Sequence, residues 1–215
     1  LEAMPLEQRI STWQSLHADE QIHALTYMRD DARKNIFKQL DEHELTTLVE
    51  RMDVDDLIEM LDELPTAVYQ AACLKLDASE KLWLATALAY TDDQCGRYAD
   101  HDVLTITKNA KVRDAVRLFK KLKEDSEYHD ALMVVDRTGR YVGLLHGTTL
   151  LGEPSHLPVF EFLDEQAPVV EGDMDLDTGS DLVSRSGYTA LAVVDAEGKL
   201  LGRISIGEAL ENVRR

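Results

Sequence analysis

The chain has 215 residues, with 41 acidic side chains against 23 basic ones and a formal net charge of −18 at pH 7. Nucleic-acid binding needs basic side chains that release phosphate counterions, so this balance argues against a nucleic-acid partner. Cys73 and Cys95 lack the spacing of a zinc knuckle or a disulfide framework. No apolar run approaches the ~18 residues of a membrane span, and no signal peptide opens the chain. These features predict a cytoplasmic protein.

Residues 5–88 divide into seven units of twelve residues, which begin at positions 5, 17, 29, 41, 53, 65 and 77. The twelfth position always holds Leu or Met: Leu16, Met28, Leu40, Met52, Leu64, Leu76 and Leu88. The ninth position is mostly apolar: Trp13, Leu25, Phe37, Val49, Leu61, Cys73 and Ala85. Positions three apart share one face of a helix, so the pattern predicts a helix in each unit with these residues buried.

Each unit opens with residue types that begin helices. Pro5 and Pro65 suit the first helical position, where the missing N–H has no partner to lose. Three capping boxes are predicted, Asp41 with Glu44, Asp53 with Asp56 and Asp77 with Glu80. Two-turn helices do not persist alone in water, so we expect the units to stack as a solenoid. A single long helix is the alternative, and the two prolines argue against it.

Residues 131–151 and 190–210 are similar in sequence, and the two copies lie 59 residues apart. Each predicts a strand, an Asp-x-x-Gly turn, a second strand and a helix start, with the turns at Asp136–Gly139 and Asp195–Gly198. Amphipathic helices are expected before each copy, at 112–122 and 176–184, and residues 152–162 join the halves. Two strand–helix–strand–strand–helix halves therefore pack through their sheets into one body.

The Val-Val-Asp-x-x-Gly pattern, present twice, resembles a tandem CBS module, named for cystathionine β-synthase. The order of helical repeat, Leu88-Ala89-Tyr90 and CBS pair resembles the cytosolic part of MgtE-type magnesium transporters. The resemblance implies an α+β multi-domain chain, with an all-α superhelical repeat domain over 1–99 and α/β CBS domains over 100–157 and 158–215. It also implies a homodimer through the CBS pair on the cytoplasmic side of the cell membrane. If the chain is a piece of a longer protein, a transmembrane domain of that protein is a further expected partner.

The fifth unit offers three acids in its first turns, Asp55, Asp56 and Glu59. Mg²⁺ prefers oxygen ligands and is often held by only one or two carboxylates. Asp55 and Glu59 are four residues apart, so we expect them to share one exposed helix face. The resemblance implies cation-binding acids at the same two positions. A solvated, capped helix start is the alternative interpretation.

Further candidate metal ligands outside the repeat are Asp92, Asp93, Asp173, Asp175, Asp177 and Glu208. The alternating acids at 173–177 lack the glycine and distal Glu of an EF-hand. The resemblance implies a role for Asp177 and Glu208, and an acidic stretch after Leu88-Ala89-Tyr90. His23 and Gly187 stand where the family has acids, which implies fewer or weaker sites. An ordinary solvated acidic loop is the alternative.

No nucleophile elbow, P-loop or metalloprotease motif is present, so we do not expect an enzyme. The leading hypothesis is a gating region in which Mg²⁺, or Ca²⁺ in its place, fills acidic sites between the helical domain and the CBS pair. The alternative is a CBS adaptor that binds an adenine nucleotide, and a plain solenoid scaffold is the third. A nucleotide is not expected, because the usual Ser/Thr-x-x-Asp endings are replaced by His146-Gly-Thr-Thr149 and Ser205-Ile-Gly-Glu208.

Overall fold

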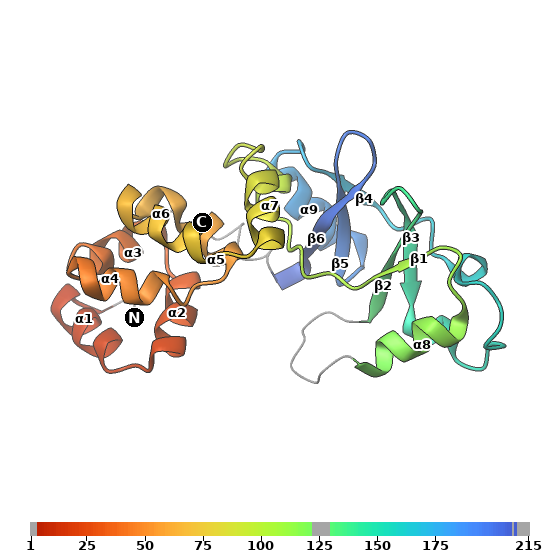
Figure 1. Cartoon of the computed structure of the whole chain (residues 1–215), viewed down its shortest axis with the longest axis horizontal. Helices are drawn as coiled ribbons and strands as arrows, with labels where there is room; N and C mark the ends of the chain where they lie inside the picture. The colour runs from red at the N-terminus through yellow and green to blue at the C-terminus, as the bar shows by residue number, and fades with distance from the viewer. Residues whose placement is uncertain (1–3, 122–129, 208, 210–215) are drawn as a thin grey trace. The chain divides into compact units, whose positions relative to one another are not determined.

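The computed structural model describes residues 4–121, 130–207 and 209. The chain divides into two compact units, a helical unit, Leu1–Leu88, and an α/β unit, Ala89–Arg215 (Figure 1). The boundaries drawn from the sequence after residues 99 and 157 stay predictions. Within the described ranges, none of the helices has the length and apolar character needed to cross a membrane.

The helical unit holds one α-helix in each twelve-residue unit, which confirms the division made from the sequence. The helices are α1 (Leu6–Gln14), α2 (Ala18–Thr26), α3 (Asp30–Phe37), α4 (Glu42–Val49), α5 (Val54–Met60), α6 (Thr66–Lys75) and α7 (Ala78–Ala87), and the 3₁₀ turn η1 (Leu61–Glu63) follows α5. Each unit's opening residue is the N-cap of its helix. Pro5 and Pro65 therefore lie one residue before the predicted position, because the residue after each proline is the first helical one.

The three predicted capping boxes are confirmed. The carboxylate of Asp41 accepts a hydrogen bond from the backbone N–H of Glu44 at 2.8 Å, and the Glu44 carboxylate accepts one from Asp41 at 2.9 Å. Asp53 with Asp56 and Asp77 with Glu80 form the same reciprocal bonds. Each box satisfies backbone N–H groups that the first turn of a helix leaves without partners.

The buried face of the helical unit shifts along the chain. The ninth position is buried in the first four units, but Cys73 is half-buried and Ala85 is exposed. The eighth position is buried from the third unit onward, at Ile36, Leu48, Met60, Ala72 and Leu84. The prediction of a buried Cys73 thiol is therefore wrong, because Ala72 takes the core position beside it. Trp13 and Trp83 are both buried, as predicted.

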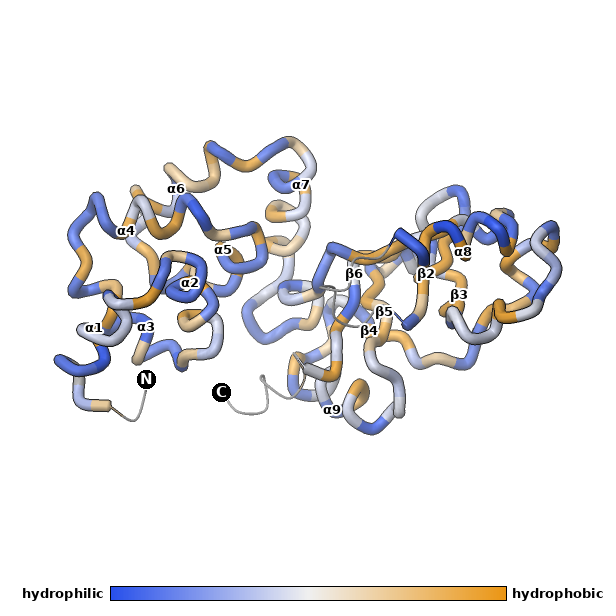
Figure 2. Tube along the Cα trace, turned by 90° about the horizontal axis from the view of Figure 1, so that it is seen from below, coloured by the Kyte–Doolittle hydropathy of each residue, from blue (hydrophilic) through white to orange (hydrophobic). Residues whose placement is uncertain are grey.

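The α/β unit contains two three-stranded sheets of the same design (Figure 1). The strands are β1 (Thr105–Thr107), β2 (Ala131–Val135) and β3 (Tyr141–His146) in one sheet, and β4 (Val169–Glu171), β5 (Ala190–Val194) and β6 (Leu200–Ser205) in the other. In each sheet the first strand pairs parallel with the second, and the second pairs antiparallel with the third. The central strands β2 and β5 are apolar and buried along most of their length, as strands covered on both faces are, and hydrophobic segments run through this unit in Figure 2.

Helices α8 (Val112–Lys121) and α9 (Leu176–Ser186) confirm the two predicted amphipathic helices, and residue 122 lies outside the described residues. Short 3₁₀ turns complete the unit at η2 (Cys95–Arg97), η3 (Gly147–Leu150) and η4 (Val159–Phe162). One core cluster joins α8 to its sheet through Val112, Ala115, Leu132, Val134 and Leu145. A second cluster, with Met133, Leu144 and Ala192, packs the two sheets together.

Both predicted Asp-x-x-Gly turns are present, with Gly139 and Gly198 at φ +84° and +78°. These left-handed conformations favour glycine over any residue with a side chain. The two turns also bond to each other, because the N–H of Tyr141 donates to Gly198 at 3.0 Å and the N–H of Leu200 donates to Gly139 at 3.1 Å. The duplicated halves are thus joined at the tips of their hairpins.

Candidate metal-binding carboxylates

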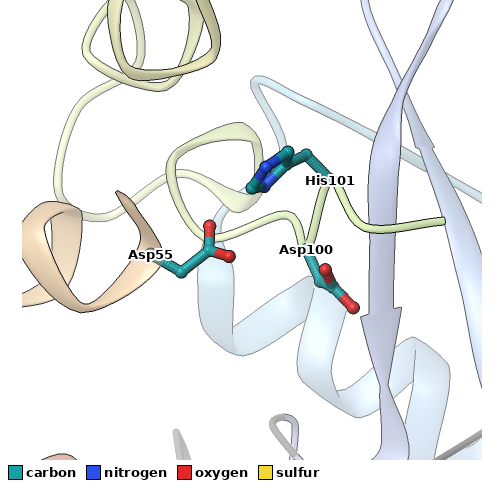
Figure 3. A group of neighbouring side chains, drawn as sticks. All are labelled: Asp55, Asp100 and His101. Atoms are coloured by element: carbon teal, nitrogen blue, oxygen red, sulfur yellow. The ribbon is translucent and has the colours of Figure 1, made fainter. Parts of the chain in front are cut away.

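Asp55 lies in the first turn of α5 and is exposed (Figure 3, which also draws Asp100 and His101 of the α/β unit). The cap formed by Asp53 begins the helix, and the next two turns bury Leu57 and Ile58. The indole N–H of Trp83, on α7, donates to Asp55 Oδ1 at 3.2 Å. The buried side chain of Trp83 on α7 therefore holds the exposed carboxylate of Asp55 on α5.

Asp56 is the partner of Asp53 in the capping box of α5 and is half-buried. Burial, together with the negative charges of Asp53, Glu59 and Asp55, raises the pKa of Asp56 to about 7. In such surroundings a carboxylate neutralised by a proton or a cation is more stable than a charged carboxylate without one. The acids at the start of α5 therefore favour a proton or a cation at Asp56.

Glu59 does not share the exposure of Asp55. Its side chain is 19% exposed, and its carboxylate accepts a hydrogen bond from the guanidinium of Arg33 on α3. Arg33 is itself only 1% exposed and also donates to Glu63 through Nε and Nη2, at 3.0 and 2.8 Å, and to Asp30 at 2.8 Å. The expectation of one exposed face for both acids is wrong, because the buried Arg33 draws Glu59 inward.

None of the sequence motifs predicts the burial of Arg33, but the alignment of the units gives a partial sign of it. Arg33 is the fifth residue of its unit, and the fifth residues of the next two units are Leu45 and Leu57, both buried. The same position is polar in three other units, at Arg9, Gln21 and Lys81, so the alignment alone does not fix the burial of Arg33. A charge that is buried there must be paired, as in an internal ion pair. Burial raises the pKa of Glu63, and Arg33 offsets part of that rise.

Two of the candidate acids in the α/β unit serve the local backbone. The carboxylate of Asp175 caps α9 by accepting the N–H of Thr178 at 3.1 Å. The carboxylate of Asp93 accepts the hydroxyl of Thr91, and its carbonyl oxygen accepts the N–H of Leu176 at 2.8 Å. The structure thus brings Asp93 beside the start of α9, which no spacing in the sequence indicates.

The other candidates of this unit are placed less closely. Asp92, Asp173 and Asp177 are exposed, and Glu208 lies outside the described residues. Within either unit, no three Asp, Glu, His or Cys side chains of the described residues bring their ligand atoms within 4.8 Å of one another. Asp175 instead caps α9, and Asp177 lies in the first turn of that helix.

Gly187, where the resemblance implies an acid, ends α9 in a left-handed conformation with φ +80°. A side chain at this φ is strained, so the helix end explains the glycine. His23, the other departure, is exposed on α2 and meets the ring of Tyr27 edge-on, with 4.8 Å between ring centroids. Neither position supplies a carboxylate.

A small cleft lies between the halves of the α/β unit, lined in part by Asp130, His146, Tyr188, Thr189 and Arg203. The hydroxyl of Thr189 donates to Asp130 at 2.9 Å. The guanidinium of Arg203 is paired with Asp100 through Nε and Nη2, at 2.8 and 2.7 Å. The charge that Arg203 could offer a phosphate is therefore already balanced by a carboxylate.

Comparison with known proteins agrees with this architecture. Residues 1–93 match the MgtE intracellular N domain, and residues 95–156 and 159–215 each match the CBS domain. The fold and these matches therefore define a chain that joins a helical MgtE N domain to a CBS pair. The chain belongs to the CBS domain family and carries an MgtE N domain, and it is homologous to the cytosolic regions of MgtE magnesium transporters.

Two curated relatives are both magnesium transporters MgtE. The protein from Bacillus subtilis is 22% identical over 213 residues, which is 99% of this chain and 47% of the relative. The protein from Thermus thermophilus is 23% identical over 159 residues, 74% of this chain and 35% of the relative. The chain thus spans less than half the length of either. A crystal structure of the cytosolic domain of the Mg²⁺ channel MgtE with ATP has the same fold, with a TM-score of 0.76, 21% identity, and coverage of 98% of this chain and 91% of that one.

Proposed function

We propose that this chain is the magnesium-sensing regulatory region of a magnesium transporter, on the cytoplasmic side of the cell membrane, and that it catalyses no reaction. The observation that carries the proposal is the start of α5, where the exposed Asp55 adjoins Asp56, whose pKa burial raises to about 7. Carboxylate oxygens such as these are the ligands that hard divalent cations prefer. Family membership supports magnesium as that cation, and Ca²⁺ is expected to substitute for it less specifically.

In this proposal, cation binding changes the balance between conformations of the chain. The first hundred residues contain 21 acids and 9 bases, and residues 161–215 contain 12 acids and 5 bases. Both regions therefore carry a net negative charge. Such regions repel over a Debye length of about 8 Å at physiological salt. Mg²⁺ bound to their carboxylates lowers this repulsion and favours a compact state, which is the transport-blocking state at high internal magnesium.

Asp55 is the principal ligand in this proposal, and Glu59 contributes less because Arg33 already neutralises it. Small-angle scattering with and without Mg²⁺ tests this assignment on the parent chain and on Asp55→Asn. Asp62→Asn is the matched control, because Asp62 is exposed on the adjoining η1 turn and outside the candidate set. The parent and the control should contract on adding Mg²⁺. Asp55→Asn should be more compact at the outset and respond less.

An equal response of Asp55→Asn and Asp62→Asn would refute the assignment of Asp55. The cation-binding role would then pass to Asp173, Asp175 and Asp177, with Asp92, Asp93 and Glu208 as the remaining candidates. Matched neutralisation of Asp173 and Asp177, which are exposed, tests that second set.

The partners in this proposal are a second copy of the chain, bound through the CBS pair, and the transmembrane domain of the same protein. The resemblance to the MgtE family supports both. Light scattering tests the first, with a dimer as the expected result. A monomer at high concentration, with and without Mg²⁺, would remove the homodimer from the proposal.

Adenine-nucleotide binding is the second candidate function. The cleft between the halves supports it, because the rings of His146 and Tyr188 stack there with centroids 6.1 Å apart. The similar MgtE cytosolic domain crystallised with ATP supports it as well. The pairing of Arg203 with Asp100 predicts weak binding. ATP that raises the melting temperature without Mg²⁺, when Mg²⁺ alone does not, would favour this function over the first.

A further inference from the structure

We propose that Trp83 is a positioning residue for the cation-binding carboxylate of Asp55, and that its indole ring reports whether a cation is bound there. The inference rests on the proposed function in taking Asp55 as a ligand. It adds a residue from a different helix, with an apolar side chain that no metal-binding pattern would select.

The geometry shows how Trp83 can act on Asp55. Trp83 is 8% exposed, and its neighbours on α7, Leu84 and Ala87, are buried as well. The ring is therefore fixed by packing, and its N–H is a stationary donor 3.2 Å from Asp55 Oδ1. An exposed carboxylate that is free to rotate loses conformational entropy when it binds an ion, whereas one already held in place loses less.

Hydrogen bonds to ligating carboxylates are a general feature of metal sites, and removing such a bond typically weakens metal affinity by about 10- to 100-fold. The indole suits this role beside a cation because it is uncharged and donates without accepting. A Lys or Arg donor would instead neutralise the carboxylate, as Arg33 does at Glu59. The bond from Trp83 to Asp55 is thus from a neutral donor, and the bond from Arg33 to Glu59 is from a charged one.

The chain contains its own control. It has two tryptophans, Trp13 and Trp83, both in the helical unit and both buried. The indole N–H of Trp13 has no hydrogen-bond partner among the described residues, whereas that of Trp83 donates to Asp55. Replacing either ring by Phe removes a similar volume from the core, but only Trp83→Phe removes a bond to the candidate ligand.

The experiment is a titration of the full chain with MgCl₂, followed by calorimetry and by tryptophan fluorescence. Trp83→Phe should raise the dissociation constant for Mg²⁺ roughly 10-fold, the lower end of the range because Asp55 is exposed. Trp13→Phe should leave the dissociation constant unchanged. In Trp13→Phe the remaining emission comes from Trp83, and it should shift with Mg²⁺ because the ion alters the electric field at the ring. The double variant Trp13→Phe/Asp55→Asn should show no shift.

The outcomes separate this inference from the proposed function. If Asp55→Asn binds Mg²⁺ as the parent does, Asp55 is not a ligand and both the site and the role of Trp83 are refuted. If Asp55→Asn binds weakly but Trp83→Phe and Trp13→Phe bind alike, the site stands and the positioning role is refuted. Should Trp83→Phe not fold, the emission of Trp83 in Trp13→Phe decides, and an emission unchanged by Mg²⁺ overturns the inference.

Discussion

Asp100 and Asp164 occupy corresponding places in the two halves of the α/β unit, and each is bonded to the other half. The N–H of Asp100 donates to Arg203 on β6 at 2.8 Å, and the N–H of Arg203 donates to Asp100 at 2.9 Å. Asp164 and Leu144 on β3 form the same pair of bonds, at 2.8 and 3.1 Å. Leu144 and Arg203 lie 59 residues apart, the spacing of the two sequence copies. The segment that leads into each half therefore completes the sheet of the other.

The segment before Asp100 is held to α9 by a close contact between Gly179 and Cys95. A Cβ atom at Gly179 would lie 2.3 Å from Cys95 Sγ, nearer than such atoms approach. Gly→Ala within a helix ordinarily stabilises by about 1 kcal/mol. We expect Gly179→Ala instead to destabilise by about 1–3 kcal/mol in urea unfolding, because the overpacked thiol must move. In a Cys95→Ala background the same change should become neutral or stabilising. Additive effects of the two substitutions would contradict this contact.

Arg33 should be among the most sensitive positions of the helical unit. Arg33→Met leaves the carboxylate of Glu63, which is 4% exposed, without its partner. Removing one member of a buried ion pair destabilises by about 3–5 kcal/mol. Arg51→Met is the control, because Arg51 pairs with Asp19 at the surface and such pairs contribute about 0.2–1 kcal/mol. Thermal unfolding by circular dichroism should show a large loss for the first and a small one for the second. Equal losses would indicate that Arg33 stabilises by packing alone.

Tyr188 should control the acid stability of the α/β unit. Its hydroxyl donates to Asp164 at 2.8 Å and, with the N–H of Gln166 and the ring of His146, holds the pKa of Asp164 below its ordinary value. A carboxylate with a lowered pKa stabilises the fold at pH values above its ordinary pKa. This stabilisation is lost as the pH falls through the lowered pKa. Tyr188→Phe should therefore reduce the free energy of unfolding at pH 7 and flatten its decline between about pH 5 and pH 3.

Tyr141→Phe is the control for Tyr188. The Tyr141 hydroxyl is buried and has no hydrogen-bond partner among the described residues, and burial raises its pKa. Removing a buried hydroxyl that lacks a partner leaves no other group unsatisfied, so stability at pH 7 should stay the same or increase. Urea unfolding at several pH values compares the two variants. A loss in Tyr141→Phe as large as that in Tyr188→Phe would assign the effect to packing.

Magnesium should stabilise the folded chain by mass action. A ligand bound only by the folded state, at one hundred times its dissociation constant, adds about 2.7 kcal/mol. Millimolar MgCl₂ should therefore raise the melting temperature in scanning calorimetry. CaCl₂ should act less specifically, and NaCl at matched ionic strength should act much less. If NaCl reproduces the shift, screening of the −18 charge explains it and no site is needed.

Local patterns in the sequence predict the local structure of this chain well. The twelve-residue repeat predicts the seven helices α1–α7, and Asp41, Asp53 and Asp77 predict their caps, because a cap is a contact between residues three apart. The duplicated Asp-x-x-Gly turns predict the two hairpins β2–β3 and β5–β6, because each turn is likewise a contact between residues close in sequence. Each of these features depends on spacing alone.

The contacts at the candidate site depend on more than spacing. Glu59 meets Arg33 across 26 residues, and Asp55 meets Trp83 across 28. Such pairs depend on how each helix is rotated about its own axis. The shift of the buried face from the ninth to the eighth position reflects a change in this rotation along the chain. The sequence therefore predicts Asp55 and Glu59 as equivalent, whereas the structure gives one a neutral donor and the other a charged one.

The caps of the helical unit also govern how this chain can change in length. Because each helix begins at its own opening residue, the insertion or loss of a whole twelve-residue unit leaves every other cap intact. A change of one or a few residues would instead separate a cap from its helix and turn the buried face outward. Evolutionary variation and protein engineering in this region should therefore proceed in steps of about twelve residues, as in other repeat proteins whose units contact mainly their neighbours.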